Sequence, residues 1–254
     1  MNLTEYIRKK RKTKEILLMA HLVCGYPDFQ ANREVVRIMV EMGVDLIELQ
    51  IPFSEPMADG PVILKANQLS LQKGTRVSDC LALMNEVSHN YPIPFLFMTY
   101  YNILFSRGVD AFCRQAGQAG GTGLIIPDIP PEEGEEYLKA CRTVSLSPIL
   151  LMTINSSRER LRLIAEAGDG FFYCVARRGV TGPKTHFTAE TGQFLDRCRQ
   201  VTELPLAVGL GISRREDFAF LQGKADIAVI GSAILRVLEQ GGYQALQSFL
   251  KGLS

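Results

Sequence analysis

The sequence lacks most of the features that mark membrane, secreted or metal-binding proteins. Its N-terminus has no apolar core of a secretory signal, and no stretch reaches the ~18 apolar residues of a membrane span. The six cysteines include no C-x-x-C pair, and the three histidines lie far apart without ligand spacing. We therefore expect a reduced, cytoplasmic protein with neither a metal site nor a disulfide framework.

An excess of either charge is also missing. The chain has 28 basic and 27 acidic residues, a net charge of +1, so nothing favours a polyanionic partner. Its one basic run, residues 8–12, is interpreted as the solvated end of a helix rather than as a nucleic-acid patch.

What the chain does contain is a regular alternation of strand and helix patterns over 254 residues, close to the ~250 typical of an eightfold β/α barrel. One domain, residues 1–254, is expected, with an extra N-terminal helix at Leu3–Arg11 plugging the barrel's bottom. The predicted strands are 16–23, 44–49, 95–100, 123–126, 149–153, 171–175, 206–208 and 227–230. The predicted helices between them are 32–42, 62–72, 78–90, 108–118, 131–144, 157–167, 190–201 and 214–221.

This alternation predicts an α/β fold, because consecutive parallel strands pair through right-handed helical crossovers. Eight such units favour a closed (β/α)8 TIM barrel, and a doubly wound open sheet is the alternative. In a barrel the chemistry lies at the C-terminal ends of the strands. The loops that follow the strands are therefore the place to search for a site.

The segment Val44–Pro61, VDLIELQIPFSEPMADGP, places two acids at one such end. Glu48 lies in the predicted buried strand, where an unpaired carboxylate is costly, so it is paired, protonated or open to a substrate cavity. Asp59 lies on a loop that its prolines and Gly60 keep irregular. The alternative is a salt-bridged core acid at Glu48 and a turn-forming Asp-Gly pair at Asp59.

Three later loops are rich in glycine. The loop at Ala176–Pro183 is long enough to act as a mobile lid. The loop at Gly209–Ser213 lets the backbone approach an anion, and Gly231-Ser232 opens a short helix whose free N–H groups point to the same place. The loops at 209–213 and 231–232 together predict a phosphate-binding corner, and ordinary tight βα turns are the alternative.

The segment around Glu48 resembles the signature of the tryptophan synthase alpha chain, E-[LV]-G-[IV]-P-F-S-D-P-x-A-D-G-P. The positions that match are Glu48, Pro52, Phe53, Ser54, Pro56, Ala58, Asp59, Gly60 and Pro61. The similarity runs nearly end to end, through residues 25–28, Tyr100, Asn102, 127–133, Arg177, 179–182, 208–212 and 230–233.

This resemblance implies an enzyme that cleaves indole-3-glycerol phosphate to indole and glyceraldehyde 3-phosphate in tryptophan biosynthesis. It implies no cofactor on this chain, and a pyridoxal-phosphate beta chain as partner in an alpha2-beta2 tetramer. In the family's pattern Glu48 falls on the general acid/base and Asp59 on the carboxylate that meets the indole nitrogen. The substrate-binding positions that it implies are Tyr173, Thr181, Gly182, Gly211, Gly231 and Ser232.

Among these positions, Thr181 falls on a lid hydroxyl that holds Asp59. The phosphate contacts fall on Gly182, Gly211, Gly231 and Ser232. Tyr173 falls on an aromatic beside the reacting centre, with an ordinary core tyrosine as the alternative. The chemistry needs a proton delivered to indole C3, a proton removed from the neighbouring hydroxyl and an acceptor for the indole N–H. Glu48 between apolar neighbours can do the first two in turn, and an ionised Asp59 the third.

Some positions depart from the family pattern. Gln50 stands where the family has glycine and adds bulk just past Glu48, and Glu55 replaces an aspartate on the loop that meets the beta chain. His21 replaces an aromatic and by strand parity faces either the site or the core.

Two alternative functions stay open: a weakly active subunit that mainly activates a beta chain, and another phosphate-binding barrel enzyme of amino-acid biosynthesis. The retained carboxylates argue against the first, and the 48–61 stretch against the second.

Overall fold

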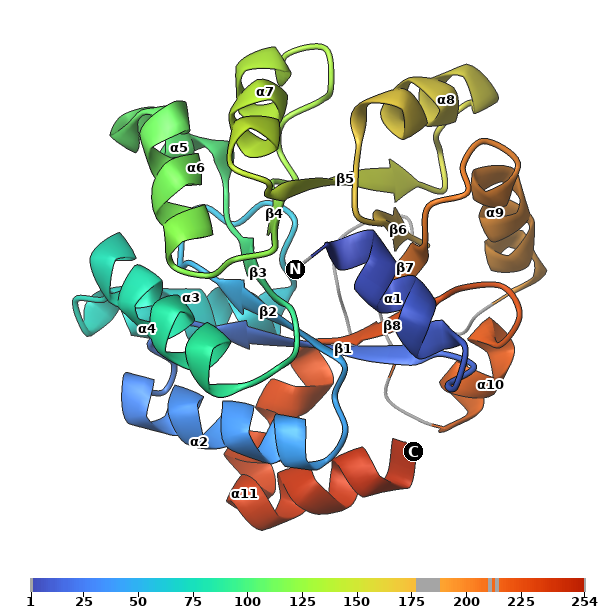
Figure 1. The fold of residues 1–254 in the computed structure, drawn as a ribbon. Helices are drawn as coiled ribbons and strands as arrows, with labels where there is room; N and C mark the ends of the chain where they lie inside the picture. The colour runs from blue at the N-terminus through green and yellow to red at the C-terminus, as the bar shows by residue number, and fades with distance from the viewer. Residues whose placement is uncertain (1, 177–187, 210–211, 213–214, 254) are drawn as a thin grey trace.

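The computed structural model describes residues 2–176, 188–209, 212 and 215–253. Within them, eight parallel strands form a closed barrel in sequence order, with β8 pairing back to β1 (Figure 1). The closed barrel is therefore confirmed over the open sheet. The strands are β1 (Leu17–Val23), β2 (Leu46–Gln50), β3 (Phe95–Met98), β4 (Gly123–Ile125), β5 (Ser147–Thr153), β6 (Phe172–Val175), β7 (Leu206–Gly209) and β8 (Ile227–Ile230).

The helices surround the barrel, as Figure 1 shows, apart from α1, which lies across one end. They are α1 (Leu3–Arg11), α2 (Phe29–Glu41), α3 (Pro61–Gln72), α4 (Val77–Asn90), α5 (Tyr101–Arg107), α6 (Val109–Gln118), α7 (Glu135–Thr143), α8 (Arg158–Ala167), α9 (Ala189–Arg199), α10 (Arg215–Leu221) and α11 (Ser232–Leu253). Gly242, with φ of 64°, interrupts α11, so the helix that Ser232 opens is short, as predicted.

Three helices show the main differences from the sequence prediction. Helix α5 was not predicted; the Asp128 side chain from the loop after β4 accepts the backbone N–H of Tyr101 at 2.9 Å and stabilises its start. Helix α2 begins three residues earlier than predicted because Asp28 caps it, accepting from the N–H of Ala31 at 2.7 Å. Helix α7 begins at Glu135 rather than Pro131, because turns occupy the residues before it.

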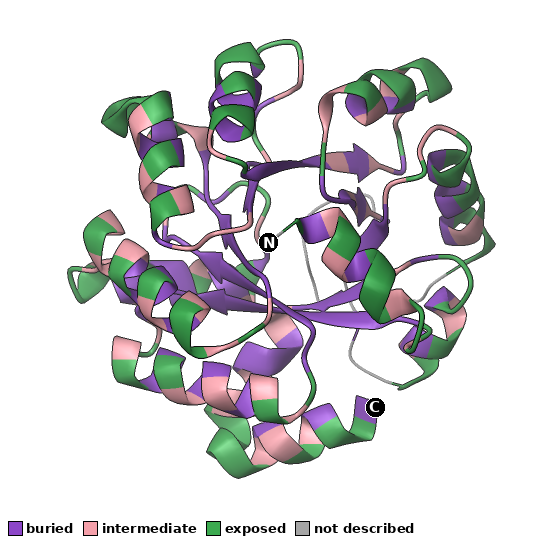
Figure 2. Ribbon diagram, in the orientation of Figure 1, coloured by how far each residue is buried: buried purple, intermediate pink, exposed green. Residues whose placement is uncertain are grey.

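The core has two layers because successive strand residues point to opposite faces. One set packs outward against the helices, and the other fills the barrel interior. Figure 2 shows the strands buried along most of their length, whereas each outer helix buries one side. The interior set includes Leu17, Met19, Leu46, Leu96, Met98, Ile125, Ile149, Phe171, Ala207, Ile227 and Val229.

Helix α1 closes the bottom of this interior. Its Leu3 and Ile7 are buried in the interior cluster. A Cβ on Gly170 would lie 3.0 Å from Cδ2 of Leu3, so a glycine there permits the close approach. The Thr4 hydroxyl also donates to the Gly170 carbonyl at 3.0 Å. The predicted plug is therefore present, and it leaves the opposite end for a site.

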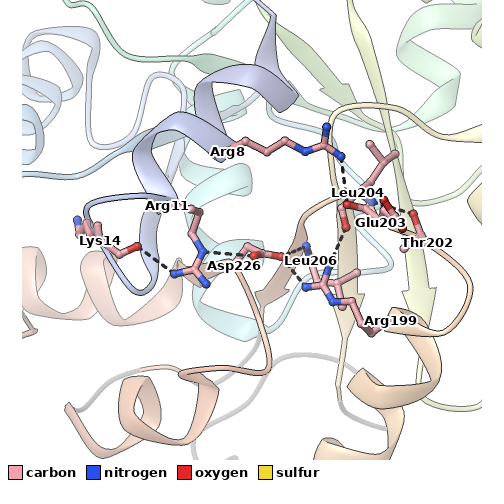
Figure 3. Close-up of polar contacts among 9 residues, drawn as sticks. All are labelled: Arg8, Arg11, Lys14, Arg199, Thr202, Glu203, Leu204, Leu206 and Asp226. Carbon is pink, nitrogen blue, oxygen red and sulfur yellow. Dashed lines mark hydrogen bonds and ion pairs between the residues drawn. The ribbon is translucent and has the colours of Figure 1, made fainter.

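A carboxylate ties the plug to the strands, as Figure 3 shows. Asp226 accepts from Nε of Arg11 at 3.3 Å, from the guanidinium of Arg199 at 2.6 Å and from the N–H of Leu206 at 2.8 Å. The Arg8 guanidinium donates to the carbonyl of Glu203 at 3.4 Å. The basic run is a solvated helix end, as predicted, at residues 8–10 and 12, which are exposed. Arg11 differs because it is half-buried against Asp226 and anchors α1.

Three general features bear on the class of protein. Within the described ranges no helix is both long and apolar enough to cross a bilayer. Nor do those ranges contain a group of three or more histidine, cysteine or acidic side chains that could hold a metal ion. All six cysteines are buried and free.

Asp226→Ala should lower the free energy of unfolding by about 1–3 kcal/mol, because it leaves two guanidinium groups and a strand N–H without their acceptor. Urea unfolding measures this loss. Glu34→Ala, which removes one exposed ion pair with Arg37 on α2, is the control and should change the free energy of unfolding little. Equal losses in the two variants would show that Asp226 is no anchor.

Candidate active site

A cavity of about 330 Å³ opens at the end of the barrel opposite α1. Its volume lies within the ~300–1,000 Å³ of small-molecule sites. The walls are mainly apolar, from side chains such as Met98, Ile125, Leu151, Ile212 and Val229. Its polar groups come from the inner faces of the strands and from the segments that follow them: His21, Glu48, Asp59, Thr153, Tyr173 and Ser232. An apolar cavity with a few convergent polar groups is suited to a small ligand with an aromatic or aliphatic body.

Glu48 faces this cavity from the interior side of β2. It is 3% exposed, and the parallel register places it beside His21 of β1. Its Oε1 lies 2.9 Å from Nδ1 of His21, whereas its Oε2 is buried and has no hydrogen-bond partner among the described residues. Glu48 is thus paired on one oxygen, and the other oxygen is left for a group inside the cavity.

Asp59 reaches the same cavity from the loop between β2 and α3. Its Oδ2 accepts from Nε2 of Gln50 at 2.6 Å and from the hydroxyl of Tyr100 at 3.2 Å. That hydroxyl in turn accepts from the N–H of Ala58 at 3.0 Å, and the Tyr100 ring stacks on Phe53 at 5.1 Å between centroids. Tyr100 therefore holds both the loop and its carboxylate in place.

Gln50 and His21 join the two acids. Nε2 of His21 lies 3.0 Å from Oε1 of Gln50, whose amide nitrogen reaches Asp59. Of the two directions that strand parity allowed for His21, the structure shows the site. Gln50 is fully buried and forms a polar bridge between His21 and Asp59. Sequence reasoning did not predict this bridge, because strand parity alone left the direction of His21 open.

The charges in the site shift the pKa values of its groups. Burial lowers the pKa of His21, but the adjacent Glu48 carboxylate, its hydrogen bond and Asp59 outweigh burial, so the pKa is above its ordinary value. Burial raises the pKa of Asp59 above its ordinary value, although His21 and the hydrogen bonds from Gln50 and Tyr100 oppose that rise. The site thus favours a positive charge on His21 near the acids.

Tyr173 points inward from β6 and forms part of the cavity wall, where it is partly exposed. Burial raises its pKa well above the ordinary value, with the charges of Glu48 and Asp59 adding to the effect, so its hydroxyl stays protonated. A Cβ on Gly209 would lie 2.3 Å from that hydroxyl. Glycine at 209 therefore has a packing reason in addition to the predicted approach of an anion.

Gly231 and Ser232 lie in the same cavity wall at the start of α11. The first N–H groups of a helix have no intrahelical acceptor, so they are available to an anion. A Cβ on Gly231 would reach ordinary contact with His21 at 3.4 Å and Ile63 at 3.5 Å, so protein packing does not demand glycine there. The other predicted positions, Thr181, Gly182 and Gly211, and most of the 176–183 loop lie outside the described residues.

The two glycines predict different effects of alanine. Gly209→Ala should lower stability by about 1–3 kcal/mol, because the methyl group overlaps the Tyr173 ring. Gly231→Ala should keep wild-type stability but weaken binding of glycerol phosphate about tenfold, or about 1.4 kcal/mol, because the added methyl group hinders the approach of the phosphate to the backbone N–H groups. Urea unfolding and calorimetric titration measure the two quantities. A Gly231→Ala variant with unchanged affinity would contradict an anion site at the start of α11.

Comparison with known proteins adds a family to this geometry. The family model described as Tryptophan synthase alpha chain matches residues 7–251. The tryptophan synthase alpha chain of Desulforapulum autotrophicum is 54% identical over 252 residues, which cover 99% of this chain and 100% of the relative. That of Syntrophotalea carbinolica is also 54% identical, over 97% of this chain and 98% of the relative.

Solved structures agree with these sequence matches. A chain of Mycobacterium tuberculosis tryptophan synthase superimposes with a TM-score of 0.92 at 34% identity, covering 99% of this chain and 96% of that chain. A chain of the tryptophan synthase a2b2 complex of Pyrococcus furiosus superimposes with a TM-score of 0.87 at 29% identity, covering 93% and 97%.

Proposed function

This chain belongs to the tryptophan synthase alpha chain family, and we propose that the cavity at its barrel mouth is where it cleaves indole-3-glycerol phosphate to indole and glyceraldehyde 3-phosphate. The activity is that of a carbon–carbon lyase of tryptophan biosynthesis. One observation carries the assignment of the site: Glu48 and Asp59 lie in the wall of one apolar cavity, together with the start of α11.

Glu48 is proposed as the acid/base residue. Cleavage places one proton on indole C3 and removes one from the hydroxyl of the carbon that leaves, so a carboxyl group that gives and then retakes a proton balances the reaction. Glu48 has the geometry for this role because its Oε2 is unpartnered in a buried wall of the cavity, among the described residues.

Asp59 is proposed to accept the indole N–H. As C3 gains a proton, positive charge develops on the ring nitrogen, and an adjacent carboxylate stabilises it. Donors from Gln50 and Tyr100 converge on one of its oxygens and support the ionised form. Thr181, expected to hold Asp59 from the loop after β6, completes this part of the proposal.

The substrate's phosphate is proposed to bind at the start of α11. Gly231 and Ser232 offer N–H groups with the helix dipole behind them, and Gly182 and Gly211 are proposed to complete the set. Tyr173 is proposed to pack against the substrate beside the reacting carbon. Because the phosphate is remote from the chemistry, its binding energy can hold the indole between the two acids.

Glu48→Gln and Asp59→Asn should each lower indole release by about 100-fold or more, because each removes a proton-transfer or charge-stabilising group. Binding of glycerol phosphate, measured by calorimetry, should survive in both. Glu34→Gln on the exposed face of α2 is the matched control and should keep full turnover. Near wild-type turnover in either site variant would contradict the assigned chemistry.

The partner is proposed to be a tryptophan synthase beta chain in an alpha2-beta2 tetramer, as named for the Pyrococcus furiosus complex. Two large apolar side chains are exposed near the barrel mouth, Met57 at 79% on the loop before α3 and Phe105 at 69% on α5. Methionine and aromatic side chains are enriched in protein interfaces, so we propose that these two side chains contribute to the contact with the partner. Glu48 and Asp59 both line the cavity, and a subunit that only activated its partner would have no need of two acids there.

Phe105→Ser should weaken assembly with the beta chain, because it removes an exposed apolar group from the proposed contact. Leu163→Ser, at a residue 49% exposed on α8, is the control and should assemble normally. Sedimentation velocity with the cognate beta chain measures assembly. Equal affinity in the two variants would place the interface elsewhere.

We also propose a cytoplasmic location. The six free cysteines support it, because thiols stay reduced in that compartment.

A further inference from the structure

Four polar side chains form one continuous chain across the cavity wall. Glu48 contacts His21 at 2.9 Å, His21 contacts Gln50 at 3.0 Å, and Gln50 contacts Asp59 at 2.6 Å. The first three residues are at most 5% exposed, so water does not compete for these contacts. The chain therefore connects the two acids of the proposed reaction through two side chains to which that reaction assigns no role.

The order of donors and acceptors starts at Asp59. An ionised carboxylate only accepts hydrogen bonds, so the Gln50 amide must turn its NH₂ group toward Asp59. Its carbonyl oxygen then faces Nε2 of His21, and that oxygen also only accepts. Nε2 must therefore carry a proton whenever Asp59 is ionised.

The same logic fixes what lies between His21 and Glu48. With Nε2 protonated, a neutral imidazole has a bare Nδ1, which cannot face a bare carboxylate oxygen at 2.9 Å without repulsion. One proton must lie between the two atoms. Either Glu48 is an acid that donates to Nδ1, or His21 is an imidazolium that donates to the Glu48 carboxylate.

We propose that Gln50 and His21 are positioning residues that couple the charge states of the two acids, so that an ionised Asp59 keeps one proton shared between Glu48 and His21. This inference rests on the proposed function, because it concerns how the same site is prepared for the reaction. The cleavage needs an ionised Asp59 and a proton available at Glu48 at the same moment. The hydrogen-bonded chain links these two conditions.

The number of protons on the pair of Glu48 and His21 is the same before and after one turnover. The shared proton passes through Glu48 to indole C3, and the bond between C3 and the side-chain carbon then breaks, its electron pair returning to the ring. The hydroxyl on that carbon becomes the aldehyde as its proton passes to Glu48. The pair of Glu48 and His21 ends the turnover with one proton, as it began, because the hydroxyl proton replaces the one that remains on indole C3. His21 also holds Oε1, which leaves Oε2 for the substrate.

The charged groups around His21 favour its protonated form. It faces Glu48 on β2 and Asp59 on the following loop, both acids, and Tyr173 of β6 lies in the same cavity wall. Burial lowers the pKa of His21, and the two acids raise it by more. Because the pKa is raised, the protonated form is favoured below it and is lost only as the pH rises through it.

Nitrogen NMR of the labelled imidazoles tests the order of donors directly. We expect Nε2 of His21 to stay protonated between about pH 6 and 9, while Nδ1 titrates above the ordinary value of about 6.5. His89, exposed on α4, is the internal reference. In Gln50→Met, the neutral His21 imidazole should no longer keep its proton on Nε2 alone. In Glu48→Gln, the pH at which His21 is half-protonated should fall. A neutral His21 with its proton on Nδ1 in the wild-type chain would overturn the proposal.

Kinetics test whether the chain matters to turnover. His21→Phe and Gln50→Met should each lower kcat for indole release by about 10- to 100-fold and change KM little, because neither side chain belongs to the phosphate site. The double variant should be no worse than the more damaged single variant, since both break the same chain. His89→Asn should match wild type.

The outcomes separate this inference from the proposed function. Multiplying effects in the double variant, or unchanged kcat in both single variants, would overturn the coupling while leaving Glu48 and Asp59 in their roles. Loss of glycerol phosphate binding in a single variant would show a general collapse of the site, and would also count against a positioning role. If the wild-type chain with its beta chain released no indole, the proposed function would fail, whereas the NMR result would still stand.

Discussion

Parallel pairing in a closed barrel imposes one constraint on which the rest depends: every second strand residue must fit inside. Near α1 these inward positions are apolar and pack around Leu3 and Ile7. One layer further along β1 and β2 they are polar, because the interior there opens into the cavity. The register that pairs His21 with Glu48 therefore decides where the site can lie.

Placing polar groups in this layer is costly unless each finds a partner. His21 and Gln50 each use both of their polar atoms in the chain between the acids. Among the described residues, the buried side-chain atom left without a partner is Oε2 of Glu48. This one unpartnered atom costs stability, and it lies where the proposed reaction needs a free carboxyl oxygen.

The sequence predicted the strand order, the closed barrel and the two acids, because periodicity and the 48–61 loop are local signals. Several element ends were wrong for reasons that differ. The cap of α2 by Asp28 is local and could have been found, whereas the start of α5 depends on Asp128, 27 residues further on. Packing of Tyr173 against Gly209 likewise needs two strands placed side by side.

The chain between the acids was beyond sequence reasoning because its contacts depend on inter-strand register as well as parity. Residues 21 and 48 are 27 positions apart, and their parity alone allowed either direction for His21. Gln50 read in isolation was only extra bulk beside Glu48. His21 and Gln50 lie on different strands, so their contact produces no pattern within either segment of the sequence.

The two departures from the family pattern explain each other. A glutamine at position 50 can donate to Asp59, but its carbonyl oxygen would then be buried without a donor if position 21 held an aromatic ring. A histidine at position 21 could pair with Glu48, but its Nε2 proton would lack an acceptor if position 50 held glycine. Each substitution alone buries an unsatisfied polar atom, whereas together they satisfy one another at 3.0 Å. Their joint presence therefore follows from the cost of burial, and the link between the two acids follows from their joint presence.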